Sequence, residues 1–250
     1  MIAASPVFSQ IVAAASLLYV LLGLATLGVN IGTRARPASQ LRLQVYAWWL
    51  IFPVVSVSLY LYPLGPSLLV LLIGALAARE LLRLWQGLGR THTHLLLATF
   101  VFALAGVSFI LALARGSAGP SWLFYLFVLT ALNDIGQFVT GTLFGRQKVA
   151  PTISPNKTWQ GLAGGVAISV LLSLALGSFL ALAPARWLAG AGAALALAGF
   201  AGDIAFSFVK RRLAIKDFST LIPGHGGILD RVDSLVLTAP LLYFAIALTL

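Results

Sequence analysis

Cysteine is absent from the 250-residue sequence and acidic residues are scarce, with six Asp and Glu against sixteen Lys and Arg. Without thiols, the chain has no disulfide framework, no thiolate metal site and no cysteine nucleophile. Charged residues make up 9% of the chain, whereas ordinary soluble domains carry about 25%. Hydrophobic residues make up 60%, and the mean hydropathy is +1.00. This composition predicts an integral membrane protein rather than a soluble domain.

The net charge is +10 at pH 7. In a soluble protein this excess would suggest a nucleic-acid partner. In a membrane protein, Lys and Arg belong to cytoplasmic loops that face anionic lipid. We therefore expect a membrane setting and no nucleic-acid partner.

Continuously apolar stretches long enough to cross the hydrocarbon core occur eight times, since a spanning helix needs about 20 residues. The predicted fold is an all-α integral membrane protein with about eight transmembrane helices and both termini outside. The stretches cover residues 8–30, 44–63, 66–84, 95–114, 120–144, 160–182, 186–209 and 232–250.

Basic residues divide fourteen to two when alternate loops are counted, which is a strong positive-inside signal. One side holds only Arg115 and Arg186. The other, predicted to be cytoplasmic, holds Arg34, Arg36, Arg42, Arg79, Arg83, Arg90, Arg146, Lys148, Lys157, Lys210, Arg211, Arg212, Lys216 and Arg231.

No soluble domain or internal repeat is visible. We expect residues 1–115 to form about four N-terminal transmembrane helices. Residues 116–250 are expected to form the catalytic helices, with cytoplasmic loops at 145–158 and 210–231. Glycines inside the later spans, at 161, 164 and 165 and in the run from 190 to 202, predict close helix packing.

Five of the six acids lie in the second half of the chain. Asp134 and Asp203 fall inside predicted spans, where a carboxylate is costly and usually faces a polar cavity or pairs with a buried cation. Either a functional site or a simple packing ion pair fits this pattern. Glu80 is flanked by Arg79 and Arg83, which favours a local ion pair on one helix.

A hydrophilic segment, KDFSTLIPGHGGILDRVDS at residues 216–234, interrupts the apolar sequence; we call it the signature loop. Asp230 and Asp233 are three residues apart, so on a helix they share a face and both can approach one cation. Oxygen ligands without Cys suit a hard ion such as Mg²⁺. The alternative is a negatively charged first turn that complements the helix dipole.

Basic residues and glycines surround these acids. A basic run beside a membrane is ordinarily an orientation signal, but together with an Asp pair it predicts a phosphate site. Gly224, Gly226 and Gly227 would let phosphate oxygens approach the backbone closely. His225 fits either a donor to phosphate or a structural turn residue.

The segment SFVKRRLAIKDFSTLIPGHGGILDRVDS (207–234) resembles the signature of the phosphatidate cytidylyltransferases, the CDP-diacylglycerol synthases. Twelve positions carry this resemblance. They are Ser207, Lys210, Arg211, Lys216, Asp217, Pro223, His225, Gly226, Gly227, Asp230, Arg231 and Asp233. A second block, NDIGQFVTGTLFGRQKVAPTISPNKTWQG (133–161), is also similar to the family, as is the Gly202-Asp203 pair. The resemblance covers about residues 130–235.

The resemblance implies a membrane-embedded nucleotidyltransferase that makes CDP-diacylglycerol and pyrophosphate from CTP and phosphatidate with Mg²⁺, in phospholipid biosynthesis. A second cation such as K⁺, a homodimer and a location in the bacterial inner membrane, with the site facing the cytoplasm, are further expectations. The implied catalytic residues are Lys216, Asp217, His225, Asp230, Arg231 and Asp233. The implied substrate-binding residues are Ser154, Lys157, Ser207, Lys210, Arg211, Gly226 and Gly227. The implied metal ligands are Asp134, Asp203, Asp230 and Asp233.

The chain departs from the family pattern at three places. Gln160 stands where the family commonly has Glu, and an amide supplies no negative charge to a metal. Gln137 and Phe138 replace the usual Ala-Tyr, and Phe206 stands where many members have a polar residue. These departures indicate a divergent branch, because every Asp of the signature is present.

Two other functions fit parts of the sequence. One is a related CTP-dependent transferase or kinase that acts on another membrane lipid. The other, more remote, is an ion-coupled transporter that uses the buried acids. Transporters tend to place their sites at the bilayer midplane between repeated halves, whereas here the acids gather toward the predicted cytoplasmic edge of one half.

Overall fold

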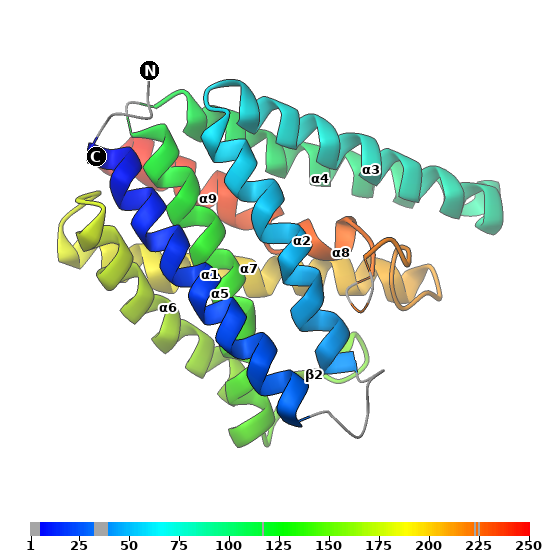
Figure 1. Ribbon diagram of the computed structural model, residues 1–250. Helices are drawn as coiled ribbons and strands as arrows, with labels where there is room; N and C mark the ends of the chain where they lie inside the picture. The colour runs from blue at the N-terminus through cyan, green and yellow to red at the C-terminus, as the bar shows by residue number, and fades with distance from the viewer. Residues whose placement is uncertain (1–5, 33–39, 117, 223, 225) are drawn as a thin grey trace.

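All eight apolar stretches form helices in the computed structural model, which describes residues 6–32, 40–116, 118–222, 224 and 226–250 (Figure 1). The first four are α1 (Pro6–Gly32), α2 (Gln40–Tyr60), α3 (Leu64–Leu88) and α4 (Thr93–Ala114). A short 3₁₀ turn, η2 (Arg90–His92), joins α3 to α4. The later helices are α5 (Gly119–Phe144), α6 (Trp159–Phe179), α7 (Ala185–Arg212), α8 (Leu229–Val232) and α9 (Leu235–Thr249).

The structure confirms the predicted fold class, an all-α integral membrane protein. Within the described residues, six helical segments are long and apolar enough to cross a membrane: α1, α4, α5, α6, α7 and the combined segment Leu229–Thr249. α2 contributes a shorter apolar stretch, Val45–Tyr60, and α3 is not among the six. Helices suit this setting because they satisfy every backbone hydrogen bond internally. The exact number of spans and the orientation of the termini stay predictions.

α5 is the central helix of the bundle and carries much of its core. Its side chains from Leu123 to Leu129 are all buried, and Leu123, Tyr125 and Leu126 have no exposed surface. α5 packs against α6 and α7 on one side and contacts α1 and α2 on another, while α3 lies against α4 (Figure 1). Side chains on α5 therefore face several helices at once.

Glycines bring the later helices into close contact, which confirms their predicted packing role. A Cβ added at Gly164 would lie 2.4 Å from Thr140 Oγ1, and one at Gly165 would lie 2.3 Å from the Gln137 side chain. Both contacts join α6 to α5. Gly190 is an exception, because an added Cβ there meets nothing within 4 Å.

The loop predicted at 145–158 contains a small antiparallel hairpin. Its strands are β1 (Lys148–Ala150) and β2 (Ser154–Thr158). Thr158 ends β2 and is the N-cap of α6, where its Oγ1 accepts a hydrogen bond from the Gly161 backbone N–H at 3.0 Å. This cap fixes the direction in which the chain leaves β2, and with it the position of Lys157.

Candidate active site

Three carboxylates from separate parts of the chain lie near one another: Asp134 on α5, Asp203 on α7 and Asp233 between α8 and α9. We call these three the acid cluster. Each interacts electrostatically with the others. The contact of α7 with Asp233 depends on Gly202, where an added Cβ would lie 2.3 Å from the Asp233 carbonyl oxygen. Ser234 Oγ donates to both carboxylate oxygens of Asp134 at 3.3 Å.

Lys157 is the cation that enters the acid cluster from the hairpin. Its Nζ lies 2.6 Å from Asp203 Oδ2 and donates to Gln137 Oε1 at 3.3 Å. Burial lowers the pKa of Lys157, but the carboxylates of Asp203 and Asp134 outweigh that effect and hold its pKa above the ordinary value. Lys157 therefore stays protonated at neutral pH.

Asp203 thus forms the ion pair with a buried cation that was one of the two predictions for it, and it also lies near Asp134 and Asp233. Its second oxygen, Oδ1, accepts a hydrogen bond from Ser207 Oγ at 3.2 Å, one turn along α7. Arg231 interacts electrostatically with both Asp134 and Asp233. The three carboxylates of the acid cluster therefore lie near Lys157 and Arg231, and Lys210, which pairs with Asp230, also interacts electrostatically with Asp203 and Asp233.

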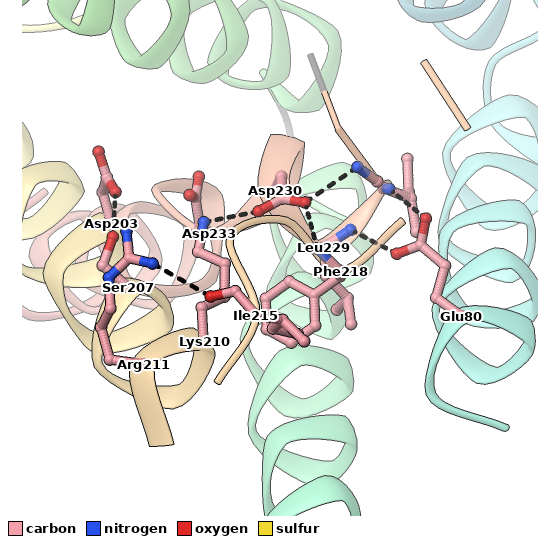
Figure 2. A network of polar contacts seen from close by, with 12 residues as sticks. Glu80, Asp203, Ser207, Lys210, Arg211, Ile215, Phe218, Leu229, Asp230 and Asp233 are labelled. Carbon is pink, nitrogen blue, oxygen red and sulfur yellow. Dashed lines mark hydrogen bonds and ion pairs between the residues drawn. The ribbon is translucent and has the colours of Figure 1, made fainter. Parts of the chain in front are cut away.

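Asp230 has partners outside the acid cluster and anchors the signature loop (Figure 2). Its Oδ1 pairs with Lys210 Nζ at 2.6 Å, and its Oδ2 accepts the backbone N–H groups of Phe218 and Gly227, each at 2.9 Å. Both partners of this ion pair are buried, at 3% exposure for Asp230 and 8% for Lys210. Both of its oxygens are thereby engaged, and its sharing of one cation with Asp233 stays a prediction.

Glu80 holds the other side of the signature loop, and the prediction of a local ion pair with Arg79 and Arg83 is wrong. Its Oε1 accepts from Ser219 Oγ at 2.6 Å and from the Ile228 N–H at 2.7 Å. Its Oε2 accepts from the Leu229 N–H at 3.1 Å. Arg79 and Arg83 are exposed on α3, whereas the buried Glu80 side chain turns inward to backbone N–H groups of the signature loop. The one hint in the sequence was its isolation, since Glu80 is the only acid before residue 134.

The glycines of the signature loop pack against carboxylates. An added Cβ at Gly226 would lie 2.7 Å from Asp230 Oδ2, and one at Gly227 would lie 2.4 Å from Glu80 Oε1. Gly226 also has φ +78°, a conformation that residues with side chains rarely adopt. Loop geometry alone therefore accounts for both glycines, and their predicted contact with phosphate is untested.

The remaining predicted residues lie around this centre. Arg211 ties the end of α7 to the hairpin, because its Nε donates to the Ile153 carbonyl at 3.1 Å. Lys216 and Asp217 are exposed, and Ser154 is partly exposed at the start of β2. Pro223 and His225 lie outside the described residues, as do Arg34 and Arg36 of the charge tally.

Gln160 has a structural role that its amide fulfils. Its Oε1 accepts the backbone N–H groups of Arg146 at 3.0 Å and Gln147 at 3.2 Å. Either Gln or Glu supplies such an acceptor. The departure from the family pattern therefore leaves the fold of the 145–158 loop intact.

A cavity of about 300 Å³ lies between α1, α2 and α5, and its lining is almost wholly apolar. Along α5 the lining runs from Phe124 through Val128 and Ala131 to Asp134. Ten residues of helix correspond to a length of about 15 Å. At the Asp134 end, Arg231 also lines the cavity. The cavity is therefore a long apolar slot whose charged end consists of Arg231 and one member of the acid cluster, Asp134.

The donor set of the acid cluster fits a hard divalent cation. It consists of carboxylate and hydroxyl oxygens, without sulfur or imidazole, which is the set Mg²⁺ prefers. As the side chains stand, no three His, Asp or Glu residues of the described part of the chain converge closely enough to form a metal site. The excess of carboxylates over Lys157 and Arg231 would be balanced by such an ion.

Comparison with known proteins shows which proteins this chain is similar to. Residues 89–249 match the model of the cytidylyltransferase family. A phosphatidate cytidylyltransferase of Staphylococcus aureus is 38% identical over 141 residues, which cover 56% of this chain and 54% of that protein. That of Brucella suis is 43% identical over 136 residues, covering 53% and 50%.

An uncharacterized Escherichia coli K12 protein, YnbB, is 40% identical over 148 residues, covering 58% of this chain and 50% of that protein. The chain thus spans about half the length of these curated relatives. The family match includes the acid cluster, Lys157 and the whole signature loop, while Glu80 and the α1 and α2 walls of the cavity lie before it. With the match covering well over half of its residues and all of this charged centre, the chain belongs to the cytidylyltransferase family.

Proposed function

We propose that the protein transfers the cytidylyl group of CTP to phosphatidate, forming CDP-diacylglycerol and pyrophosphate. The observation that carries the proposal is the apolar slot that ends at Asp134 and Arg231, beside the acid cluster. Such a slot suits an acyl chain, and its charged end suits a phosphate headgroup and a metal-bound nucleotide. A cytidylyltransferase that acts on a water-soluble substrate has no need of a connection of this kind.

In the proposed reaction, a phosphate oxygen of phosphatidate attacks the α-phosphorus of CTP. The new phosphorus–oxygen bond forms as the bond from the α-phosphorus to the bridging oxygen breaks, and pyrophosphate leaves with its electron pair. The phosphate is already anionic at neutral pH, so this step needs no strong general base. The protein has to position two anionic substrates and offset their charge.

The acid cluster would hold Mg²⁺. When bound, the ion polarises phosphoryl oxygens and offsets the charge of the triphosphate and of the leaving pyrophosphate. Lys157 is held in the cluster by Asp203 and Gln137, and its raised pKa keeps it cationic beside the phosphates. Arg231, which lines the charged end of the slot, would bind the headgroup of the lipid.

Asp230 has a positioning role in this proposal, because its oxygens are bound by Lys210 and by the loop backbone. Lys216, Asp217 and Arg211 would contact the nucleotide from the exposed side of the signature loop. The bacterial inner membrane, a site on the cytoplasmic side, a homodimer and a second cation such as K⁺ remain predictions from the sequence.

The decisive experiment uses purified protein in phosphatidate-containing vesicles with CTP labelled at the α-phosphate or at the γ-phosphate. Transfer of the α-label to lipid with release of pyrophosphate supports the proposal. Transfer of the γ-label alone identifies a lipid kinase instead, and transfer of neither label rejects both enzymes.

Asp203→Asn and Asp233→Asn should each lower α-label transfer by about 100-fold or more and weaken its dependence on Mg²⁺. Ser108→Ala is a suitable control for expression and insertion, because Ser108 is exposed on α4 and its hydroxyl bonds within its own helix. Full activity in both Asn variants would end the assignment of the acid cluster.

A further inference from the structure

Glu80 is a buried carboxylate that the proposed chemistry does not use. It is 3% exposed and lies on α3, before the start of the family match at residue 89. Burying a charge is costly unless hydrogen bonds or opposite charges compensate for it. Within the part of the chain that the structure describes, no Lys or Arg lies within ion-pair distance of Glu80. Its compensation therefore comes from the signature loop.

Three donors of the signature loop point at this carboxylate. Ser219 Oγ lies near the beginning of the loop, and the N–H groups of Ile228 and Leu229 lie at the start of the helical segment that leads to Asp233. Figure 2 shows Glu80 reaching from α3 on one side of the loop, with Asp230 between it and Asp203 and Asp233. Hydrogen bonds to an ionised acceptor are about twice as strong as neutral ones. Glu80 thus fastens two separate points of the signature loop, at Ser219 and at Ile228–Leu229, to a separate helix.

Gly227 lies between two carboxylates. Its N–H donates to Asp230 Oδ2 at 2.9 Å, and an added Cβ would lie 2.4 Å from Glu80 Oε1. The backbone from Gly227 to Leu229 is therefore held from the α3 side by Glu80 and from the α7 side by the pair of Asp230 with Lys210. A displacement of this segment would also displace Arg231 and Asp233, which follow directly in the chain.

We propose that Glu80 is a positioning residue: it fixes the signature loop from α3 so that Arg231 and Asp233 stay aligned with Asp134 and Asp203. The link to catalysis rests on the proposed function, whereas the tether itself does not. It assigns a catalytic contribution to α3, which lies outside the matched residues. It also explains why residue 227 is glycine: a side chain there would collide with the Glu80 carboxylate, so close approach of a phosphate is not needed as the reason.

The tether is tested first without substrate, by hydrogen–deuterium exchange on the purified full-length protein. In Glu80→Ala the N–H groups of Ile228 and Leu229 lose their acceptor, so the segment 226–229 should exchange at least about tenfold faster. Arg83→Ala is the matched control, because Arg83 is exposed on the same helix. Unchanged exchange in Glu80→Ala overturns the tether, whether or not the protein is a cytidylyltransferase.

Catalytic alignment is tested by α-label transfer from CTP to phosphatidate. In Glu80→Ala we expect kcat to fall on the order of 100-fold, since small displacements of reacting groups are costly, with a smaller rise in KM for CTP. Glu80→Gln keeps one acceptor oxygen and should recover part of kcat. A purely structural residue would lower the melting temperature and leave kcat of the folded protein unchanged, and that result overturns the positioning role.

Gly227 provides a second, independent test through a double-mutant cycle. Gly227→Ala should be severely impaired, because its Cβ would collide with Glu80. Glu80→Asp withdraws the carboxylate, so Gly227→Ala should cost at least about tenfold less in that background. An equal cost in both backgrounds would show that Gly227 serves something other than the Glu80 contact.

If the wild-type protein transfers no label, the proposed function fails. The exchange experiment then still decides whether Glu80 holds the signature loop.

Discussion

The N-terminal helices α1 to α3 differ from the rest of the bundle in packing and in charge. α1 buries two side chains, Ile11 and Leu22, whereas α5 buries fourteen residues. Five of the six acids lie on or after α5, and the N-terminal helices carry only Glu80. The N-terminal part nevertheless supplies two walls of the apolar slot and the Glu80 contact with the signature loop. The N-terminal helices therefore shape a site whose acid cluster and cations come from α5 and the residues after it.

This division matches the extent of the family relationship. The matched residues, 89–249, contain the acid cluster and its cations, which would serve any substrate carrying a triphosphate. The slot depends on α1 and α2, which contact the lipid part of a substrate in the proposed reaction. Under the proposed function, reaction type and lipid preference would then depend on different parts of the chain. Variants that affect one part and spare the other test this division.

The largest effect is expected from Lys210→Met, in the densely packed part. This change leaves Asp230 buried without its cation, and removing one partner of a buried pair costs about 3–5 kcal/mol. Thermal unfolding of the detergent-solubilised protein measures the loss. The paired change Lys210→Met with Asp230→Leu should recover a large part of it, and no recovery would place the cost outside this pair.

The packing contrast is tested by the same substitution in both parts. Leu126 has no exposed surface on α5, so Leu126→Ala should reduce the free energy of unfolding by about 2–5 kcal/mol. Leu24 is 59% exposed on α1, and Leu24→Ala should change the free energy of unfolding by no more than about 0.5 kcal/mol. Denaturant titration of both variants measures the difference. Equal losses would mean that α1 is covered in the functional state.

Lipid preference is tested by narrowing the slot from the N-terminal side. Ala15 lines the slot and Ala15→Phe would shorten it, while Ala13→Phe adds the same bulk on an exposed face of α1. Each buried methylene contributes about 0.8 kcal/mol, so excluding two should lower kcat/KM for long-chain phosphatidate by about tenfold. For dioctanoyl phosphatidate, kcat/KM should equal that of the wild type. A uniform loss with both lipids would argue against a chain-length role.

The smallest effect is expected from Gln160→Glu. Its Oε1 accepts from two backbone N–H groups, and a carboxylate oxygen accepts equally well. Activity and stability should therefore stay within about 0.5 kcal/mol, or roughly twofold, of the wild type. A large gain in kcat would instead show that a negative charge at this position takes part in catalysis.

Much of the fold was predictable because membrane helices leave a plain signal. Each apolar stretch became a helix, and glycines such as Gly164 and Gly165 pack at helix contacts as their spacing predicts. The candidate site residues were predicted from the signature loop and the block at 133–161, through their resemblance to a known family. The partners of the acids were harder to predict, because Asp230 and Asp233 are near neighbours in sequence yet face different groups.

The amino-acid sequence alone determined the membrane setting, the helices, the family and the residues proposed for the site. These follow from local composition and from spacing within short segments. Only the tertiary structure decided which groups each carboxylate faces. Asp233 joins Asp134 and Asp203, Asp230 anchors the loop on Lys210, and Glu80 binds backbone groups about 150 residues further along the chain. Such contacts depend on how whole helices pack, and no local pattern encodes the backbone N–H groups of a distant loop as the partners of a buried charge.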